Sequence, residues 1–182
     1  MVPRDVALID WQAWIPTERA VLCFVRRDGE LLLIRKKRGL GAGKVNGPGG
    51  RIEPGETAEA AAVRETEEEV GATPLDLSES GELSFQFVDG YGLHCHVFVA
   101  RDLSGEPRET DEALPFWCEE GRIPFDEMWA DDRLWFPLML RGRPFRGVFV
   151  FDGDEMLSQR IDAGGERRAL PAQGSRDAAG QN

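Results

Sequence analysis

Residues 49–72 read GGRIEPGETAEAAAVRETEEEVGA, and this stretch decides the fold. From Glu56 to Val70 it contains no glycine or proline and is rich in alanine and glutamate, which predicts a helix. Thr57 is a suitable N-cap, and Gly71 is a suitable end for that helix. The preceding residues, 39–55, are rich in glycine but also include apolar side chains, which favours a structured loop that approaches a ligand.

Three glutamates extend the small-residue face of this helix. Successive residues of a helix turn by about 100°, which places one stripe on a single face, composed of Ala58, Ala61, Ala62, Glu65, Glu68 and Glu69. Like charges three and four residues apart repel each other, and a bound divalent cation would remove that repulsion. Carboxylate oxygens suit Mg²⁺ or Mn²⁺ better than zinc. For such a helix on its own, an acidic face in contact with solvent is the favoured interpretation.

The spacing of these residues resembles the signature of the Nudix hydrolase superfamily. Every fixed position is matched in Gly50-x5-Glu56-x7-Arg64-Glu65-Thr66-x-Glu68-Glu69-x-Gly71-Ala72. Thr66 and Ala72 stand where the signature has a bulky aliphatic residue. The resemblance implies an α/β (α+β) protein with the Nudix fold, a mixed β-sheet sandwiched between helices. It also implies an enzyme that uses Mg²⁺, with Mn²⁺ as a possible substitute, to cut a nucleoside polyphosphate inside its phosphate chain.

The resemblance also implies roles for individual residues. The catalytic set that it implies is Arg64, Glu65, Glu68 and Glu69. Arg64 would pair with Glu56 and tie the loop to the helix. The three helix carboxylates would bind the metal together with the carbonyl of Gly49, and Glu112 is a further candidate ligand from a second loop. One carboxylate would take a proton from the attacking water, and Glu68 and Glu69 are the two candidates.

Further segments of interest are GLGAGKVNGPGGRIEPGET (39–57), FQFV (85–88), ETDE (109–112), IPFDEMWADDRLWFPLML (123–140) and FRGVF (145–149). They resemble the MutT-like branch of this family, which hydrolyses oxidised purine nucleoside triphosphates. This resemblance covers about residues 21–151. It implies conversion of 8-oxo-dGTP or 2-hydroxy-dATP to the monophosphate and pyrophosphate, which sanitises the nucleotide pool. The substrate-binding residues that it implies are Lys36, Asn46, Gly50, Phe85, Phe87, Trp129, Asp131 and Asp132.

Asp131 and Asp132 are adjacent, and their chemistry agrees with recognition of a base. Two carboxyl groups side by side in a partly apolar pocket cannot both ionise cheaply, so one keeps its proton and donates while the other accepts. Trp129 would stack on the base, a contact worth about 1–3 kcal/mol. Simpler roles remain open, because Trp129 suits a core position and Asp131 suits a helix cap. Phe85 and Phe87 share one strand face and suit a core equally well.

The rest of the chain predicts two hairpins, a second helix and a further strand. Residues 20–36 surround an Asp28-Gly29 turn, and residues 83–88 and 93–100 form the second hairpin. A helix is expected within residues 129–140 and a strand over residues 146–151. We expect an N-terminal extension (1–19), a Nudix hydrolase domain (20–162) and a flexible C-terminal tail (163–182). Trp11 and Trp14 predict that the extension packs on the domain or on a partner.

Composition limits the partners. A net charge of −11 argues against binding of a nucleic-acid polymer, and no apolar run is long enough to cross a membrane. We therefore expect a monomer that binds a small-molecule nucleotide. The cysteines, all beside apolar neighbours, predict reduced thiols and a cytoplasmic location. His94 and His96 share a strand face, but no cysteine or further histidine completes a zinc site, so we interpret them as structural.

Two rival functions remain at this point. One is a Nudix hydrolase that acts on another nucleoside diphosphate derivative, either a dinucleotide or a nucleotide sugar. The other is a non-catalytic, nucleotide-binding Nudix module, which would have no need of the complete carboxylate set.

Overall fold

The computed structural model describes residues 2–164. The α-helices of this part are α1 (Ala58–Val70) and α2 (Asp132–Leu140), and short 3-10 helices are η1 (Val6–Leu8), η2 (Glu120–Arg122) and η3 (Phe125–Glu127). Its strands are β1 (Glu18–Arg27), β2 (Glu30–Lys36), β3 (Val45–Asn46), β4 (Gly49–Arg51), β5 (Thr73–Leu75), β6 (Ser78–Phe87), β7 (Gly92–Ala100), β8 (Asp102–Ser104), β9 (Ala113–Glu119), β10 (Phe145–Asp152) and β11 (Glu155–Ala163).

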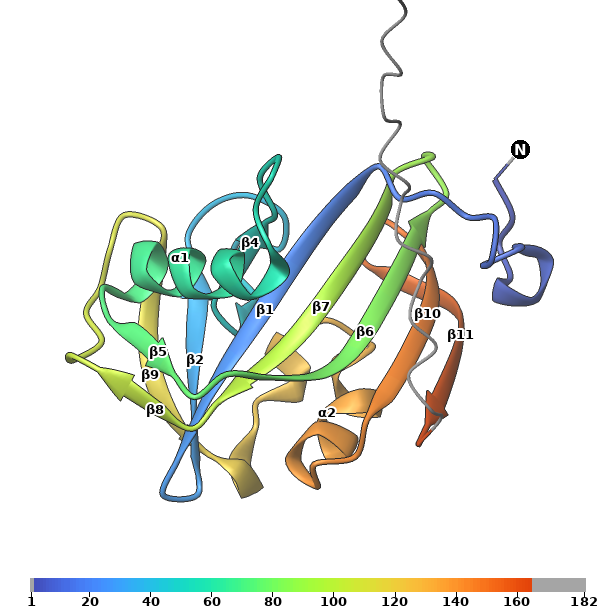
Figure 1. Cartoon of the computed structure of the whole chain (residues 1–182). Helices are drawn as coiled ribbons and strands as arrows, with labels where there is room; N and C mark the ends of the chain where they lie inside the picture. Colours follow the sequence, from blue (N-terminus) through green and yellow to red (C-terminus); the bar gives the residue numbers. More distant parts are fainter. Residues whose placement is uncertain (1, 165–182) are drawn as a thin grey trace, which may run out of the picture.

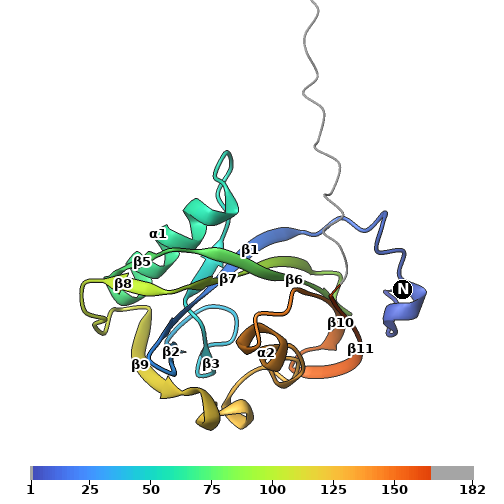
Figure 2. The same ribbon diagram turned by 60° about the horizontal axis from the view of Figure 1, so that its bottom comes forward.

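Within residues 2–164, nine strands form one mixed sheet. Its order is β11-β10-β6-β7-β1-β2-β3, with β4 paired to β1 and β9 paired to β2, while β5 and β8 form a separate small sheet. The pairs β1–β7 and β10–β6 are parallel, and all other strands that are adjacent in this order pair in the antiparallel sense. Helices α1 and α2 lie on opposite faces of the sheet (Figures 1 and 2). The expected mixed sheet between helices is therefore confirmed.

Helix α1 has the ends that its sequence predicts. Its N-cap is Thr57, whose side chain accepts a hydrogen bond from the N–H of Ala60 at 3.1 Å. Gly71 ends it in the left-handed conformation with φ of 70°, which glycine adopts without strain. The signature position Thr66 is fully buried, and its hydroxyl donates to the carbonyl of Ala62 at 2.7 Å. The polar group in place of a bulky aliphatic side chain is thus satisfied inside the core.

Local turn chemistry also explains the hairpins. Asp28 and Gly29 have φ of 53° and 81°, as a two-residue turn that follows the twist of its strands requires. The second hairpin is longer than the sequence pattern, since β6 already begins at Ser78. Strand β11 was not expected. It forms an exposed edge of the sheet, so its sequence, EMLSQRIDA, lacks a clear apolar face.

The N-terminal extension packs on the domain. Val6 is buried, and its N–H donates to Ser158 Oγ of β11 at 3.2 Å. The indole N–H of Trp14 donates to Gln86 Oε1 of β6 at 2.7 Å, and Trp14 also contacts Trp11. Of the tail expected over residues 163–182, residues 165–182 lie outside the described part of the chain.

Two further expectations concern the cysteines and a membrane span. Cys23 and Cys95 are buried, Cys118 is half-buried, and all are free thiols, as expected. Among the described residues, neither helix has the length and apolar character that crossing a bilayer requires.

Candidate active site

Every site residue predicted from the sequence lines one cavity of about 800 Å³. The cavity runs from the carboxylates of α1, past the glycine-rich loop, to the sheet face near α2. At the α1 end lie Gly49, Gly50, Arg64, Glu65, Glu68, Glu69 and Glu112. Lys36 lies beside Glu69 of this end, and toward α2 lie Asn46, Phe85, Phe87, Trp129, Asp131 and Asp132. The fold therefore brings together residues that are far apart in the sequence.

The glycine pair at the start of the signature permits a close approach of backbone and side chains. A β-carbon at position 49 would overlap the carbonyl oxygen of Val21, and one at position 50 would overlap the carboxylate of Glu65. Strand β4, which contains both glycines, pairs with β1, so the loop is held against the sheet. The lack of side chains at Gly49 and Gly50 thus lets α1 place its carboxylates directly against this strand.

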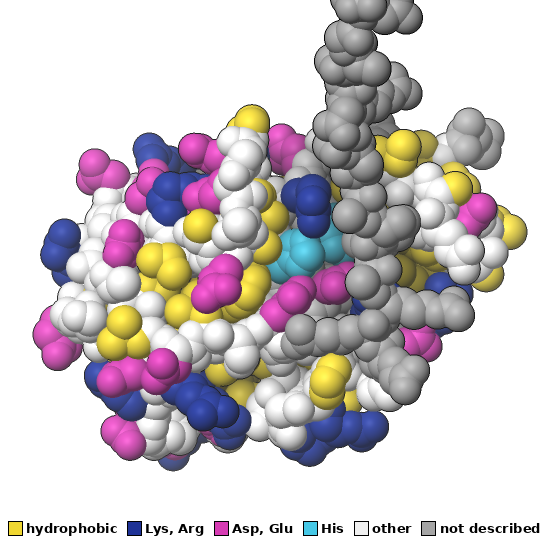
Figure 3. All heavy atoms as spheres, viewed as in Figure 1, with side chains coloured by type: hydrophobic (Ala, Val, Ile, Leu, Met, Phe, Trp, Pro, Cys, Tyr) yellow, Lys and Arg dark blue, Asp and Glu magenta, His cyan; other side chains and the backbone are white. Residues whose placement is uncertain are grey.

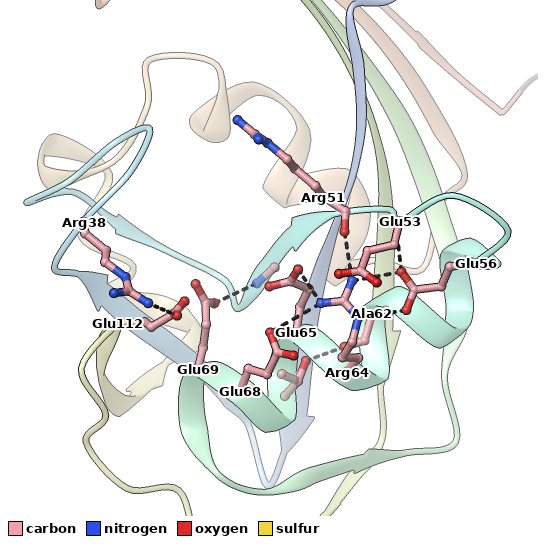
Figure 4. A network of polar contacts seen from close by, with 12 residues as sticks. Arg38, Arg51, Glu53, Glu56, Ala62, Arg64, Glu65, Glu68, Glu69 and Glu112 are labelled. Carbon is pink, nitrogen blue, oxygen red and sulfur yellow. Dashed lines mark hydrogen bonds and ion pairs between the residues drawn. The ribbon is translucent and has the colours of Figure 1, made fainter.

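Arg64 connects the loop to the helix, as expected (Figure 4). Its Nε and Nη2 atoms donate to the two carboxylate oxygens of Glu56 at 2.9 and 2.8 Å. Nη2 also donates to the carbonyl of Arg51 at 3.0 Å. The hydrogen bonds from Arg64 lower the pKa of Glu56 to about 2, and the same pairing raises the pKa of Arg64. The pair therefore stays ionised and fixes the loop on α1.

The three helix carboxylates have different partners. Arg64 Nη1 donates to Glu65 at 2.7 Å and to Glu68 at 3.3 Å. Glu69 instead accepts from the N–H of Gly49 at 2.9 Å and lies 3.7 Å from the ammonium of Lys36. Glu112 lies opposite α1, where it forms an ion pair with Arg38 (Figure 4).

Burial leaves two of these carboxylates poorly solvated. Glu69 is almost fully buried, and burial raises its pKa to about 7, against the opposing effects of Lys36 and the Gly49 N–H. Burial also raises the pKa of Glu65. The negative charges of nearby acidic groups, Glu112 among them, raise both values further. A cation at this end of the cavity would relieve this unfavourable concentration of negative charge.

Asp131 and Asp132 are buried at the other end of the cavity. Trp135 Nε1 donates to Asp131 Oδ2 at 2.9 Å, and the N–H of Trp129 donates to Asp132 Oδ2 at 3.1 Å. Asp131 Oδ1 is buried without a hydrogen-bond partner among the described residues. Burial raises the pKa of Asp131 to about 6 and raises that of Asp132 as well, which the charge of Asp131 raises further.

The structure decides against one simpler role for this pair. Asp131 occupies the position before α2, but its side chain makes no capping hydrogen bond. Its carboxylate turns to the indole of Trp135, one helical turn further on. The alternative role of Asp131 as a side-chain cap of α2 is therefore excluded.

Aromatic rings form the apolar wall between the two ends. Phe85 stacks on Phe149 with ring centroids 5.2 Å apart, and Phe87 lies 5.7 Å from Phe151. The ring of Trp129 meets Phe151 edge to face at 5.7 Å. Because they belong to the core and also line the cavity, Phe85 and Phe87 fit both interpretations of their strand.

Comparison with known proteins agrees with this geometry. A model of the NUDIX domain matches residues 16–139. The chain belongs to the Nudix family. It is 47% identical over 143 residues to the oxidized purine nucleoside triphosphate hydrolase of Danio rerio. The aligned region covers 78% of this chain and 92% of that protein. The protein of the same name from Mus musculus is 43% identical over 142 residues, or 77% of this chain and 91% of that protein.

A solved structure supports the fold. The MutT protein of Bacillus halodurans superposes with a TM-score of 0.72 at 28% identity, over 80% of this chain and 97% of that one. Membership of the Nudix family implies a divalent metal cofactor and a nucleotide substrate, both of which suit the carboxylates and the size of the cavity.

The sequence did not indicate several side chains that line this cavity or lie next to residues that line it. Lys44 lies with its ammonium 4.9 Å from the centre of the Trp129 ring, and Trp135 holds Asp131. The spacing of Asp131 and Trp135, four residues apart on an expected helix, was a usable signal for their contact. The ion pair of Arg38 with Glu112 joins two loops. No local pattern in the sequence indicates that pair.

Proposed function

We propose that this Nudix hydrolase converts oxidised purine nucleoside triphosphates, such as 8-oxo-dGTP and 2-hydroxy-dATP, to the monophosphate and pyrophosphate. The observation that carries the proposal is the buried pair Asp131 and Asp132 beside Trp129. Sharing a proton, the pair offers a hydrogen-bond donor next to an acceptor, and exchange of the proton reverses their order. Oxidation changes the donors and acceptors on a purine edge, so such a pair accommodates the altered pattern.

The residues at the α1 end fit a hard divalent cation. All the candidate side chains are carboxylates, and burial and like charges oppose the ionisation of two of them, Glu65 and Glu69. We assign the metal, Mg²⁺ or in its place Mn²⁺, to the carbonyl of Gly49 and the carboxylates of Glu65, Glu68, Glu69 and Glu112. When bound, Mg²⁺ neutralises charge on the phosphate chain and lowers the pKa of a bound water.

The remaining roles belong to the protein's own groups. Arg64 orients Glu65 and Glu68 through its hydrogen bonds, and either Glu68 or Glu69 accepts the proton of the attacking water. Lys36 and the backbone of Gly50 face the phosphates, while Asn46, Phe85 and Phe87 enclose the base between the two aspartates and Trp129. The free thiols support a reducing, cytoplasmic setting, where we propose that the chain acts as a monomer without nucleic-acid or membrane partners.

Pyrophosphate release tests the proposal. We would compare 8-oxo-dGTP, 2-hydroxy-dATP, dGTP and dATP in Mg²⁺ with wild type, Glu69→Gln and Asp131→Asn. Asp126→Asn is the matched control, because that carboxylate is exposed and lies outside the cavity. We expect about a tenfold or greater preference for the oxidised nucleotides, based on the discrimination that buried polar groups achieve. Glu69→Gln should lose turnover, and Asp131→Asn should lose discrimination.

Two results would contradict this assignment. Cleavage of a dinucleotide or nucleotide sugar, without cleavage of any triphosphate, would retain the metal chemistry and refute the base pocket. Binding of nucleotides without any hydrolysis would identify a non-catalytic module.

A further inference from the structure

A cluster of histidine and glutamate side chains lies on the sheet outside the cavity. The side chains of Leu93 and Cys95 line the cavity, and because side chains alternate along a strand, His94 and His96 of β7 point to the opposite face. Figure 3 shows histidine side chains at the surface of this face, next to acidic ones. The neighbouring strand β6 contributes Glu79, whose carboxylate lies 2.8 Å from His96, and Glu82, whose carboxylate lies 3.8 Å from His94.

A bulge in β6 brings both glutamates to the same face. Glu82 pairs directly with His96 in the register of β6 and β7, and the register shifts between Glu79 and Gly81. Without that extra residue, Glu79 would point to the side opposite Glu82. Among the described residues, Glu79, Glu82 and His96 form a group whose potential metal-binding atoms all lie within 4.8 Å of one another.

His94 provides a second, independent indication of a ligand. It is 9% exposed, and its Nε2 is buried with no hydrogen-bond partner among the described residues. This nitrogen lies 3.8 Å from Glu82 Oε2, and the His94 ring meets the His96 ring edge to face at 4.9 Å. With its proton on Nδ1, the ring donates to Ser84 Oγ at 2.9 Å and leaves the Nε2 lone pair directed into the cluster.

We propose that His94, His96, Glu79 and Glu82 form a zinc-binding site that is separate from the catalytic metal site. Two imidazole nitrogens and two carboxylate oxygens are a ligand set that zinc accepts in tetrahedral geometry. Ligand atoms on one zinc lie about 3.4 Å apart, as bond lengths near 2.1 Å require. The atoms of Glu79, Glu82 and His96, at most 4.8 Å apart, therefore need to close in by up to about 1.4 Å, and His94, which is outside that group, needs to move in from its place 3.8 Å from Glu82.

The present contacts of the cluster are compatible with metal binding. His96 Nδ1 lies 2.8 Å from Glu79 Oε1, so one proton is shared where a cation would lie. Arg19 Nη2 lies 3.0 Å from His96 Nε2, and Arg146 Nη2 lies 3.6 Å from Glu82 Oε1. Both guanidinium groups are on exposed side chains, which can turn toward solvent. A bound zinc ion would then neutralise the negative charge of the glutamates in their place.

Calorimetric titration of the full chain with Zn²⁺ tests the proposal, in millimolar Mg²⁺ so that the catalytic carboxylates are already engaged. The variants are His94→Gln with His96→Gln, and separately Glu79→Gln with Glu82→Gln. Glu119→Gln on β9 is the matched control, because that carboxylate is exposed and remote from the cluster. A zinc-dependent rise in Tm is the second readout, since a ligand that binds only the folded state stabilises it.

We expect wild type and the control to bind one Zn²⁺ per chain, and both cluster variants to bind it at least about tenfold more weakly. If the histidine variant fails to fold, the glutamate variant decides. Absence of Zn²⁺ binding to wild type, or equal binding by wild type and the glutamate variant, would overturn the proposal. Binding that is lost only in Glu68→Gln with Glu69→Gln would place the zinc at the catalytic carboxylates and would overturn it too.

Discussion

Replacing Asp131 with asparagine is expected to make the stability of the protein less dependent on pH. The side chain of Asp131 is almost fully buried, and within residues 2–164 only one of its carboxylate oxygens has a hydrogen-bond partner, the indole of Trp135. Burial raises its pKa from the ordinary value of 3.8 to about 6. The folded protein therefore binds this proton more tightly than the unfolded chain does.

The sign and size of the effect follow from this difference. A raised carboxyl pKa contributes stability that is present below about pH 4 and is lost as the pH rises through about 6. One pKa unit corresponds to about 1.4 kcal/mol, so the loss amounts to about 3 kcal/mol. Asparagine keeps an acceptor for the Trp135 indole and has no charge to bury. Because asparagine carries no negative charge, the substitution also lowers the pKa of Asp132. This second effect likewise makes the free energy of unfolding less dependent on pH.

Urea unfolding of wild type and Asp131→Asn, followed from pH 4 to pH 8, measures this difference. The free energy of unfolding of the variant, relative to wild type, should increase by about 3 kcal/mol over this range. A constant offset is expected in addition, because the amide N–H₂ group takes the place of the unpartnered Oδ1. Asp126→Asn serves as the exposed control. A difference that stays constant with pH would refute the proton-sharing pair on which the base pocket depends.

Three further outcomes are expected. Gly50→Ala places a β-carbon into the carboxylate of Glu65, so steady-state kinetics should show kcat reduced about tenfold or more while circular dichroism shows a folded protein. Trp135→Phe removes the hydrogen bond to Asp131, and denaturant titration should show a loss of about 1–3 kcal/mol, whereas an unchanged midpoint would deny that contact. Chelation with EDTA should abolish pyrophosphate release, and added Mg²⁺ should restore it. Release that continues in EDTA would show that the carboxylates bind no essential metal.

The sequence predicts the elements whose causes are local. The ends of α1 depend on Thr57 and Gly71, and the first hairpin depends on Asp28 and Gly29. The predicted bounds of both elements therefore agree with the structure to within about two residues. Strand β11 was missed because an exposed edge strand needs no apolar alternation. Its pairing with β10 supplies the backbone hydrogen bonds that the sequence pattern does not indicate.

The sequence pattern does not predict which side chains of neighbouring strands come into contact. The sequence favours a structural role for His94 and His96, because no cysteine or further histidine completes a zinc site. The register of β6 against β7, including its bulge, places Glu79 and Glu82 beside them. A register shift of one residue reverses the face of every side chain, so sequence alone could not decide which acidic groups share this face.

The two ends of the cavity illustrate how environment separates residues of the same type. Glu69 is buried but faces the Gly49 N–H and the ammonium of Lys36, so its surroundings already favour the charged form in part. A metal cation would complete that compensation. Asp131 and Asp132 are buried just as deeply, one oxygen of Asp131 has no hydrogen-bond partner among the described residues, and the charge of Asp131 further raises the pKa of Asp132, so the pair retains a proton. On the proposed function, an acidic protein can therefore bind a polyanion: one end of its cavity would gather cations around the phosphates, and the other would present a protonated carboxyl group to the base.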